Sequence, residues 1–329
     1  MIDTRLTLVV TLALALLATP LAADAQQAGK IYRIGVLETI SATLNVANLN
    51  ALRQGLRELG YVEGQNVVIE YRSADGRAER FPDLATELVR LKVDLIVTRG
   101  TPAARAAKNV TGAIPVVMAA IGEPLGTSVV AGLARPGGNV TGLSAFVTEL
   151  EGKRLELLRE MVPRIARIAA LFNMSNPFFL PVWKELEASA RSQGLQAQLL
   201  DVRDPRDIGR AFDTAIKQRV DALSVGIDAV TQANPRLIAD LAAKHRLPAI
   251  YPSREFVDAG GLISYGVSYP DLYRRAATFV DKIFKGATPG NLPVEQPTRF
   301  ELVINLKTAK ALDLTIPPSV QLRTDHVVE

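Results

Sequence analysis

Two short stretches combine a glycine with residues that suit an anion, each directly after or within an apolar run. They are TRGTPAA (98–104) and AAIGEP (119–124). If a helix begins after each glycine, the free N–H groups and the dipole at its start attract anions. In the first stretch Thr101 can cap the helix and offer a hydroxyl, and Pro102 fits the first helical turn. The two stretches therefore predict a site for a carboxylate or another anion; two well-capped tight turns without a ligand are the alternative.

The second half of the chain has polar and aromatic residues at comparable places. Asn173 and Asn176 lie in FNMSNP, and Asp228 ends the run DALSVGID. Asp228 is a natural partner for a ligand ammonium group, but it is equally suited to cap a helix. Tyr251 and Tyr265 lie in two later apolar runs, where they form either part of the core or an aromatic wall of a binding site.

Few residues suit catalysis. The chain has no cysteine and two histidines, His245 and His326, so a zinc or non-haem iron site has too few ligands. Neither a G-x-x-x-x-G-K-S/T loop nor a G-x-S-x-G elbow occurs, and RPGGN (135–139) does not join a strand to a helix as a dinucleotide-binding loop does. We therefore expect no metal, no cofactor and no enzymatic activity.

The N-terminal segment predicts export. MIDTR precedes the apolar run 6–22, and the small-residue step ADA follows at 23–25. This order is typical of a signal peptide, residues 1–25, cleaved before Gln26; a membrane anchor is the alternative. The lack of cysteine excludes a lipidated cysteine and disulfides, which suits a bacterial periplasm. Cleavage removes two aspartates and one arginine and takes the formal net charge from +4 to +5. This small, dispersed charge argues against nucleic acid as a partner.

Strand and helix patterns alternate after residue 30, in two successive series. The first has strands at 31–38, 66–73, 94–100 and 114–122, helices at 44–61 and 81–93, and a helix beginning after each of the last two strands. The second has a helix at 149–162, strands at 167–173, 195–202, 221–228, 247–251 and 261–268, and helices at 181–194, 204–218, 235–245 and 271–286, with Asp204 as one cap. The alternation predicts parallel sheets with helices on both faces, and the restart predicts two α/β lobes.

Several longer stretches together cover nearly the whole chain after residue 30. They are ALRQGLRELGYVEGQNVVIEYR, FPDLATELVRLKVDLIVTRGTPAARAAK, GLARPGGNVTGLS, GKRLELLREMVP, REFVDAGGLISYG, DLYRRAATFVDKIFKGATPGNLPVEQP and FELVINLKTAKALDLTIPPS. In this order the chain resembles the periplasmic substrate-binding proteins of ABC importers, in the group related to tryptophan- and tyrosine-uptake binding proteins. The resemblance implies a type I periplasmic-binding-protein-like α/β fold, with two doubly wound parallel-sheet lobes joined by a three-strand hinge and closing on a ligand.

The resemblance also implies lobe boundaries and cleft residues. The N-terminal lobe comprises 28–146 with about 267–291, and the C-terminal lobe 147–266 with about 292–329. The cleft residues that it implies are Thr39, Thr98, Gly100, Thr101, Gly122 and Glu123 in the first lobe and Asn173, Asn176 and Asp228 in the second, with Tyr251 and Tyr265 nearby. Many relatives have aspartate at the position of Glu123.

We expect a monomeric periplasmic receptor that binds a small organic solute, such as an amino acid or another carboxylate, and delivers it to an ABC permease in the inner membrane. A carboxylate would bind at the helix starts after Gly100 and Gly122, an amine would pair with Asp228, and Tyr251 or Tyr265 would pack on the apolar part. A sensory module for a membrane receptor is the main alternative. A periplasmic enzyme is a weaker one, because both histidines are peripheral.

Overall fold

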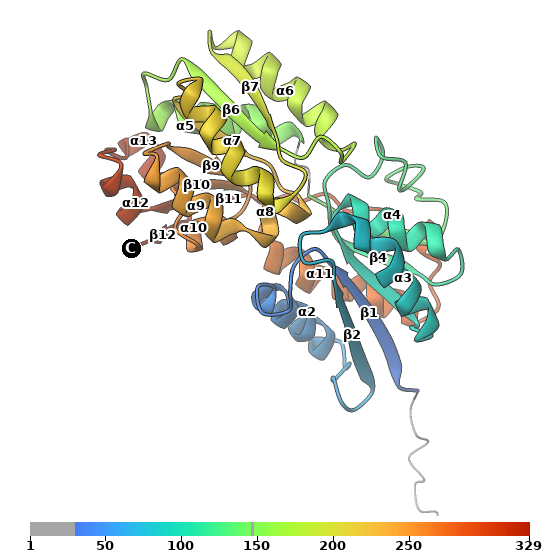
Figure 1. Cartoon of the computed structure of the whole chain (residues 1–329). Helices are drawn as coiled ribbons and strands as arrows, with labels where there is room; N and C mark the ends of the chain where they lie inside the picture. Colours follow the sequence, from blue (N-terminus) through green and yellow to red (C-terminus); the bar gives the residue numbers. More distant parts are fainter. Residues whose placement is uncertain (1–29, 146–147) are drawn as a thin grey trace, which may run out of the picture. The chain divides into compact units, whose positions relative to one another are not determined.

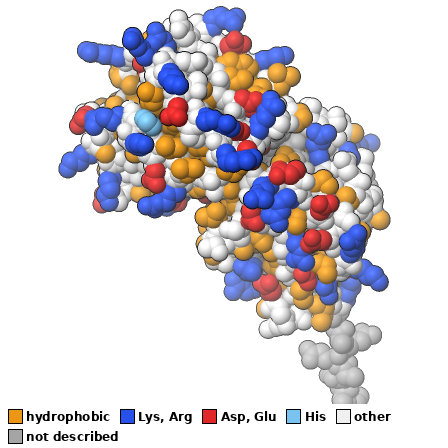
Figure 2. Space-filling view, viewed as in Figure 1, with side chains coloured by type: hydrophobic (Ala, Val, Ile, Leu, Met, Phe, Trp, Pro, Cys, Tyr) orange, Lys and Arg blue, Asp and Glu red, His pale blue; other side chains and the backbone are white. Residues whose placement is uncertain are grey.

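The computed structural model describes residues 30–145 and 148–329 (Figure 1). The predicted signal peptide lies outside the described residues. From Tyr32 to Glu329 the chain forms one unit that contains two β-sheets. No helix in the described part is long and apolar enough to cross a membrane. Basic and acidic side chains are interspersed over the face shown in Figure 2, in keeping with the small net charge of +4.

The first sheet is parallel throughout and has the strand order β2-β1-β3-β4-β5. Its strands are β1 (Tyr32–Glu38), β2 (Val67–Ser73), β3 (Leu95–Arg99), β4 (Val116–Ile121) and β5 (Val140–Ser144). The apolar faces of α3 (Phe81–Arg90) and α4 (Thr101–Val110) cover one side of the sheet. A short 3-10 turn, η1 (Ala78–Arg80), precedes α3. Helix α2 (Val46–Glu58) covers the other side. We call this sheet and its helices the first lobe.

The second sheet has the strand order β12-β11-β10-β9-β8-β6-β7. Its strands are β6 (Arg167–Phe172), β7 (Gln196–Asp201), β8 (Ala222–Val225), β9 (Ala249–Tyr251), β10 (Ile263–Gly266), β11 (Glu301–Asn305) and β12 (His326–Val328). The 3-10 turn η2 (Thr148–Leu150) precedes its first helix. Its helices are α5 (Glu151–Met161), α6 (Phe179–Ser192), α7 (Pro205–Lys217), α8 (Ala229–Ala233), α9 (Pro235–Lys244), α10 (Arg254–Asp258), α12 (Leu306–Ala311) and α13 (Pro318–Gln321). Helices α7 and α9 share one buried cluster with the sheet, and α5, α12 and α13 share another. These elements form the second lobe.

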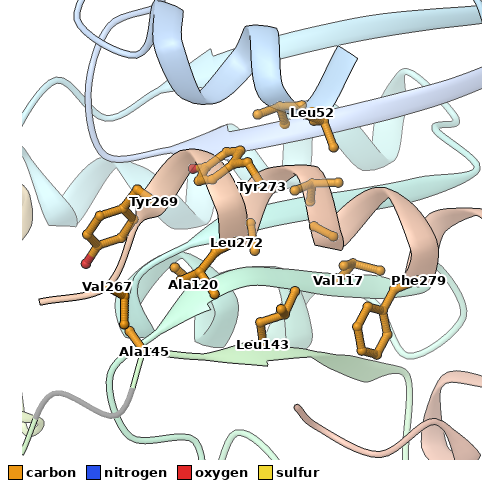
Figure 3. Packing of buried hydrophobic residues seen from close by; sticks show 14 of the residues in the cluster. Leu52, Val117, Ala120, Leu143, Ala145, Val267, Tyr269, Leu272, Tyr273 and Phe279 are labelled. Carbon is orange, nitrogen blue, oxygen red and sulfur yellow. The ribbon is translucent and has the colours of Figure 1, made fainter. Parts of the chain in front are cut away.

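One helix of the first lobe comes from late in the chain. Helix α11 (Tyr269–Phe284) packs against α2 and β4, and Leu272 and Phe279 share a buried cluster with Leu52 and Val117 (Figure 3). The chain therefore passes between the lobes three times, after β5, after β10, and between the 3-10 turn η3 (Pro289–Asn291) and β11.

The predicted α/β fold with two parallel-sheet lobes is confirmed. The structure adds the short elements α8, α10, α12, α13 and β12, which the sequence analysis does not predict, and it differs from the prediction after β4 and at β11. No helix follows β4: residues 122–139 form turns that lead into β5, a strand that the sequence analysis does not predict. Glycine or proline recurs every few residues in this segment and disfavours a helix. Strand β11 runs antiparallel to β10, because the chain leaves the sheet after β10, passes through α11 and returns at the same end.

Candidate functional site

A small cavity lies between the strand ends of the two lobes. Its lining comprises Thr39, Arg99, Gly100, Thr101, Pro102, Ala120, Ile121, Gly122, Ala145 and Tyr269 from the first lobe, and Asn176, Phe178, Ile227, Asp228, Ala229 and Gln232 from the second. Its volume of about 30 Å³ leaves room for about two water molecules. Ligands of open α/β sheets bind at such carboxyl ends of strands. The lining includes the predicted residues Thr39, Gly100, Thr101, Gly122, Asn176 and Asp228.

The turn after β3 presents the start of α4 to this cavity. Gly100 is the N-cap residue with φ of +81°, a backbone conformation that glycine adopts without strain. Thr101 is the first residue of α4 and its side chain makes no capping bond, so the prediction that Thr101 caps the helix is wrong. Thr101 lines the cavity, at the start of a helix whose first N–H groups have no partner within the helix.

The turn after β4 does not repeat this arrangement. No helix begins after Gly122, so the predicted second helix start for a carboxylate is wrong. Gly122 instead lies directly against a ring of the second lobe: a Cβ atom there would come within 2.5 Å of Phe178. Glu123 is not in the lining; its Oε1 accepts hydrogen bonds from the N–H groups of Leu125 and Gly126, at 3.2 and 3.4 Å.

Asp228 brings a buried carboxylate to the opposite wall. It is the N-cap of α8, and its Oδ1 accepts hydrogen bonds from Nδ2 of Asn173 at 2.8 Å and from the N–H of Val230 at 3.2 Å. Its Oδ2 accepts from Nδ2 of Asn176 at 3.0 Å. Asp228 thus both caps a helix and lines the cavity. Burial raises its pKa, against the lowering effect of the two asparagines, and none of the described arginines or lysines forms an ion pair with it.

Arg99 is the charged residue of the cavity that sequence reasoning missed. It ends β3 and its side chain is 1% exposed. Its guanidinium lies 4.1 Å from the ring centre of Tyr269 and donates to Oε2 of Glu255 at 2.8 Å. Burial alone would lower the pKa of Arg99, but Glu255 and other neighbours raise it above its ordinary value. An arginine at the carboxyl end of the buried strand LIVTR was the available signal.

Gln232 links Arg99 to the loop after β1. In the amide orientation that satisfies both neighbours, its oxygen accepts from Nη2 and Nε of Arg99 at 2.7 and 3.0 Å, and its nitrogen donates to Oγ1 of Thr39 at 2.8 Å. Gln232 belongs to α8 of the second lobe. The polar side of the cavity is therefore a continuous network that crosses from one lobe to the other.

Glu38 lies behind this network, at the end of β1. It is fully buried, and it accepts hydrogen bonds from the hydroxyl of Tyr273 and, at 3.1 Å, from the N–H of Thr39. Burial raises its pKa to about 7, although Arg99 opposes the shift. Glu38 does not line the cavity, but it adjoins two residues that do, Thr39 and Arg99.

The remaining predicted residues lie elsewhere. Thr98 is buried in β3, and its hydroxyl has no partner among the described residues. Tyr251 is buried in the core of the second lobe, 5.2 Å from Phe256 between ring centres. Tyr265 packs near Phe300, 6.0 Å between ring centres. The tyrosine that lines the cavity is Tyr269, which precedes a proline at the start of a helix, as Thr101 does.

A wider groove adjoins the cavity and shares part of its lining. Its volume is about 260 Å³, and Thr101, Pro102, Asn176 and Asp228 belong to both. Asn173 lines this groove rather than the cavity. Asp228 therefore stands between the inner cavity and the wider space.

The chain is similar to known proteins over both lobes. Residues 33–328 match the family model described as ABC transporter substrate binding protein. The chain is 27% identical over 279 residues to the tyrosine-binding protein of Clostridioides difficile (strain R20291), which covers 84% of this chain and 80% of that protein.

Two solved structures are similar to this one. The ABC domain in complex with L-Trp from Streptococcus pneumonia has a TM-score of 0.83 and 30% identity, covering 90% of this chain and 99% of that chain. A conserved domain protein from Vibrio cholerae has a TM-score of 0.85 and 28% identity, covering 91% of this chain and 100% of that chain. Together with the family match, they confirm the predicted two-lobe periplasmic-binding-protein fold.

Proposed function

The chain belongs to the ABC transporter substrate-binding proteins, and on this basis we propose that its cavity binds an amino acid with an apolar side chain for delivery to an ABC permease. The family consists of extracytoplasmic binding proteins rather than enzymes, so the prediction that the chain is not an enzyme is confirmed. Relatives named for tyrosine and solved with L-Trp support an aromatic amino acid as the solute.

The observation that carries the proposal is the carboxylate of Asp228. It is 4% exposed and is held by two asparagine amides, with no cation of the described chain paired to it. A buried carboxylate is stable as a charged group when a cation pairs with it. An ammonium group of the solute supplies that cation.

The other walls of the cavity suit the rest of an amino acid. Thr101 and the first turn of α4 offer a hydroxyl and N–H groups to a carboxylate. Phe178 and Tyr269 offer aromatic surface to an apolar side chain. Because the cavity holds only about two water molecules, the solute enters when the lobes separate at the three passages between them, and Phe178 moves away from Gly122.

Binding measurements on the purified chain test this proposal. We expect L-tryptophan or L-tyrosine to raise the melting temperature. The amine without the carboxylate (tryptamine or tyramine) and the acid without the amine (3-indolepropionate or 3-(4-hydroxyphenyl)propionate) are expected to bind at least about tenfold more weakly, about 1.4 kcal/mol.

Asp228→Asn is expected to lower the affinity for the amino acid on the order of tenfold to a hundredfold, as measured by calorimetry, and to leave the affinity for the acid without the amine unchanged. Asp240→Asn, on an exposed face of α9, is the control. If Asp228→Asn binds the amino acid as tightly as the unaltered chain, Asp228 is not the ammonium site.

We also propose that the chain acts as a monomer in the periplasm. The support for the periplasmic location is the apolar run 6–22 followed by ADA at 23–25, the order of a cleavable signal peptide. The mass of the exported protein is expected to correspond to a chain that begins at Gln26. A mass that retains residues 1–25 in the membrane fraction would indicate an anchor instead.

A further inference from the structure

Polar contacts also join the two lobes outside the cavity lining, and one acidic residue makes two of them. Glu255 of α10, in the second lobe, accepts hydrogen bonds from Arg99 and Asn48 of the first lobe. We infer that Glu255 is a positioning residue that favours the closed arrangement of the lobes whether or not a solute is bound. It acts through Arg99, which lines the cavity, whereas Glu255 does not. The inference concerns closure of the lobes and does not depend on which solute binds.

Both oxygens of the Glu255 carboxylate take part. Nη2 of Arg99 donates to Oε2 at 2.8 Å, and Nδ2 of Asn48 donates to Oε1 at 3.0 Å. The hydroxyl of Ser253, in the same lobe as Glu255, lies 3.3 Å from Oε2 and orients the carboxylate. Although burial opposes ionisation, the Arg99 guanidinium holds the pKa of Glu255 below its ordinary value, so the carboxylate stays charged at neutral pH.

The burial of Arg99 makes separation of the lobes costly. When the lobes separate, its guanidinium loses Glu255 and Gln232, which both belong to the second lobe. It keeps the ring of Tyr269 and a contact of 3.4 Å with Oδ1 of Asn45. In the closed arrangement this pair is shielded from water, so its charges interact more strongly than those of an exposed pair. Water that reaches the guanidinium on opening offsets part of this gain, because Arg99 lines the cavity. The contact of Arg99 with Glu255 therefore favours the closed arrangement.

Water access makes this contact reversible. A groove of about 320 Å³ lies on the other side of Glu255, lined by both lobes, with Asn48, Ser253 and Tyr269 among its residues. The Glu255 side chain is 31% exposed, against 1% for Arg99. Water in the groove hydrates the carboxylate when it leaves Arg99, which reduces the cost of opening. The two lobes are thus expected to close and reopen without a solute.

Distance measurements between two spin labels test the inference. The chain has no cysteine, so Glu79→Cys in the first lobe and Arg206→Cys in the second carry the labels specifically; both residues are exposed. Without solute we expect the short distance of the closed arrangement to predominate in the otherwise unaltered chain. Glu255→Gln, which keeps the size of the side chain but removes its charge, is expected to add a population at longer distance. Asn48→Ala removes the neutral donor to Glu255, together with its hydrogen bond to Oδ1 of Asn45, and leaves the ion pair with Arg99. It is expected to have a smaller effect.

The control is Glu58→Gln, because Glu58 pairs with Arg274 at 3.0 Å within the first lobe. It is expected to leave the distance unchanged. A purely structural role for Glu255 would lower the melting temperature of Glu255→Gln without adding the longer distance, and this outcome would overturn the inference. So would an equal shift in Glu58→Gln. If Glu255→Gln does not fold, the Asn48→Ala distances decide: no longer-distance population in that variant overturns the inference.

Binding kinetics give a second readout. For L-tryptophan, Glu255→Gln is expected to raise the dissociation rate on the order of tenfold with a smaller change in the association rate, because the variant weakens the closed state rather than the encounter. An unchanged dissociation rate would contradict the inference. If L-tryptophan does not bind the unaltered chain, the proposed function fails, but the distances without solute still decide the role of Glu255.

Discussion

Glu38 is the residue whose protonation bears most directly on stability. Burial raises its pKa from an ordinary value of 4.5 to about 7. The charged or titratable groups around it are Arg99, Glu255, Tyr71 and Tyr273. Between these two pKa values the folded chain holds a proton that the unfolded chain releases. The contribution of Glu38 to stability is therefore fully present below about pH 4.5 and is lost as the pH rises through about 7.

Glu38→Gln is expected to remove this contribution. The free energy of unfolding of the unaltered chain, relative to the variant, is expected to fall by roughly 2 kcal/mol between pH 5 and pH 7, at about 1.4 kcal/mol per pH unit over most of that range. Urea unfolding of both chains at several pH values measures the difference. Other carboxylates titrate equally in both chains and cancel. Parallel pH curves for the two chains would show that Glu38 has an ordinary pKa.

At this scale, residues at turns could be predicted from the sequence and residues inside strands could not. Gly100, Thr101 and Asp228 follow apolar runs, and the rule that ligands bind at strand ends located them. Arg99 was missed because it belongs to the strand itself. Its partner Glu255 is 156 residues away in the chain, and no local pattern joins the two. Tyr251 was placed near the cleft because it ends a strand, but its ring faces the core.

The scale of whole elements shows the same limit. Asp204 was predicted to cap a helix, and it does: its side chain accepts from the N–H of Arg206 at 2.9 Å, and Asp207 accepts from the N–H of Asp204 at 3.0 Å. Both partners are close in sequence, so the pattern sufficed. Strand β5 was missed because VTGLS is short and contains a glycine. The antiparallel direction of β11 depends on the route of the chain through the other lobe, which periodicity does not encode.

Asp204→Ala is expected to lower the free energy of unfolding by about 1 kcal/mol. The variant lacks the side chain that accepts from the N–H of Arg206, and the capping box with Asp207 loses one of its two halves. Chemical denaturation measures this change. Asp213→Ala, on an exposed position of the same helix, is the control and is expected to be neutral or slightly stabilising, since alanine favours helices. Equal losses in the two variants would show that general charge, rather than capping, is responsible.

At the scale of the whole molecule, the restart of the strand–helix pattern near residue 149 was enough to predict two lobes. Periodicity alone groups the helix at 271–286 with the second series, however, and only the resemblance to substrate-binding proteins assigned it to the first lobe. The structure places α11 in the core that it shares with α2 and β4 (Figure 3). Which lobe a helix joins is decided by the passage between lobes that precedes it, here the one after Gly266.

The position of α11 also sets the order in which the molecule can be completed. A ribosome makes α2 more than two hundred residues before α11, and until α11 arrives Leu49, Leu52 and Leu56 lack the helix that covers them. The lobe that is begun first thus remains incomplete until α11 has been made, and its apolar surface stays exposed to water during most of synthesis. For a chain exported to the periplasm, as proposed here, we expect this delay to keep the first lobe from folding completely until most of the chain has been made.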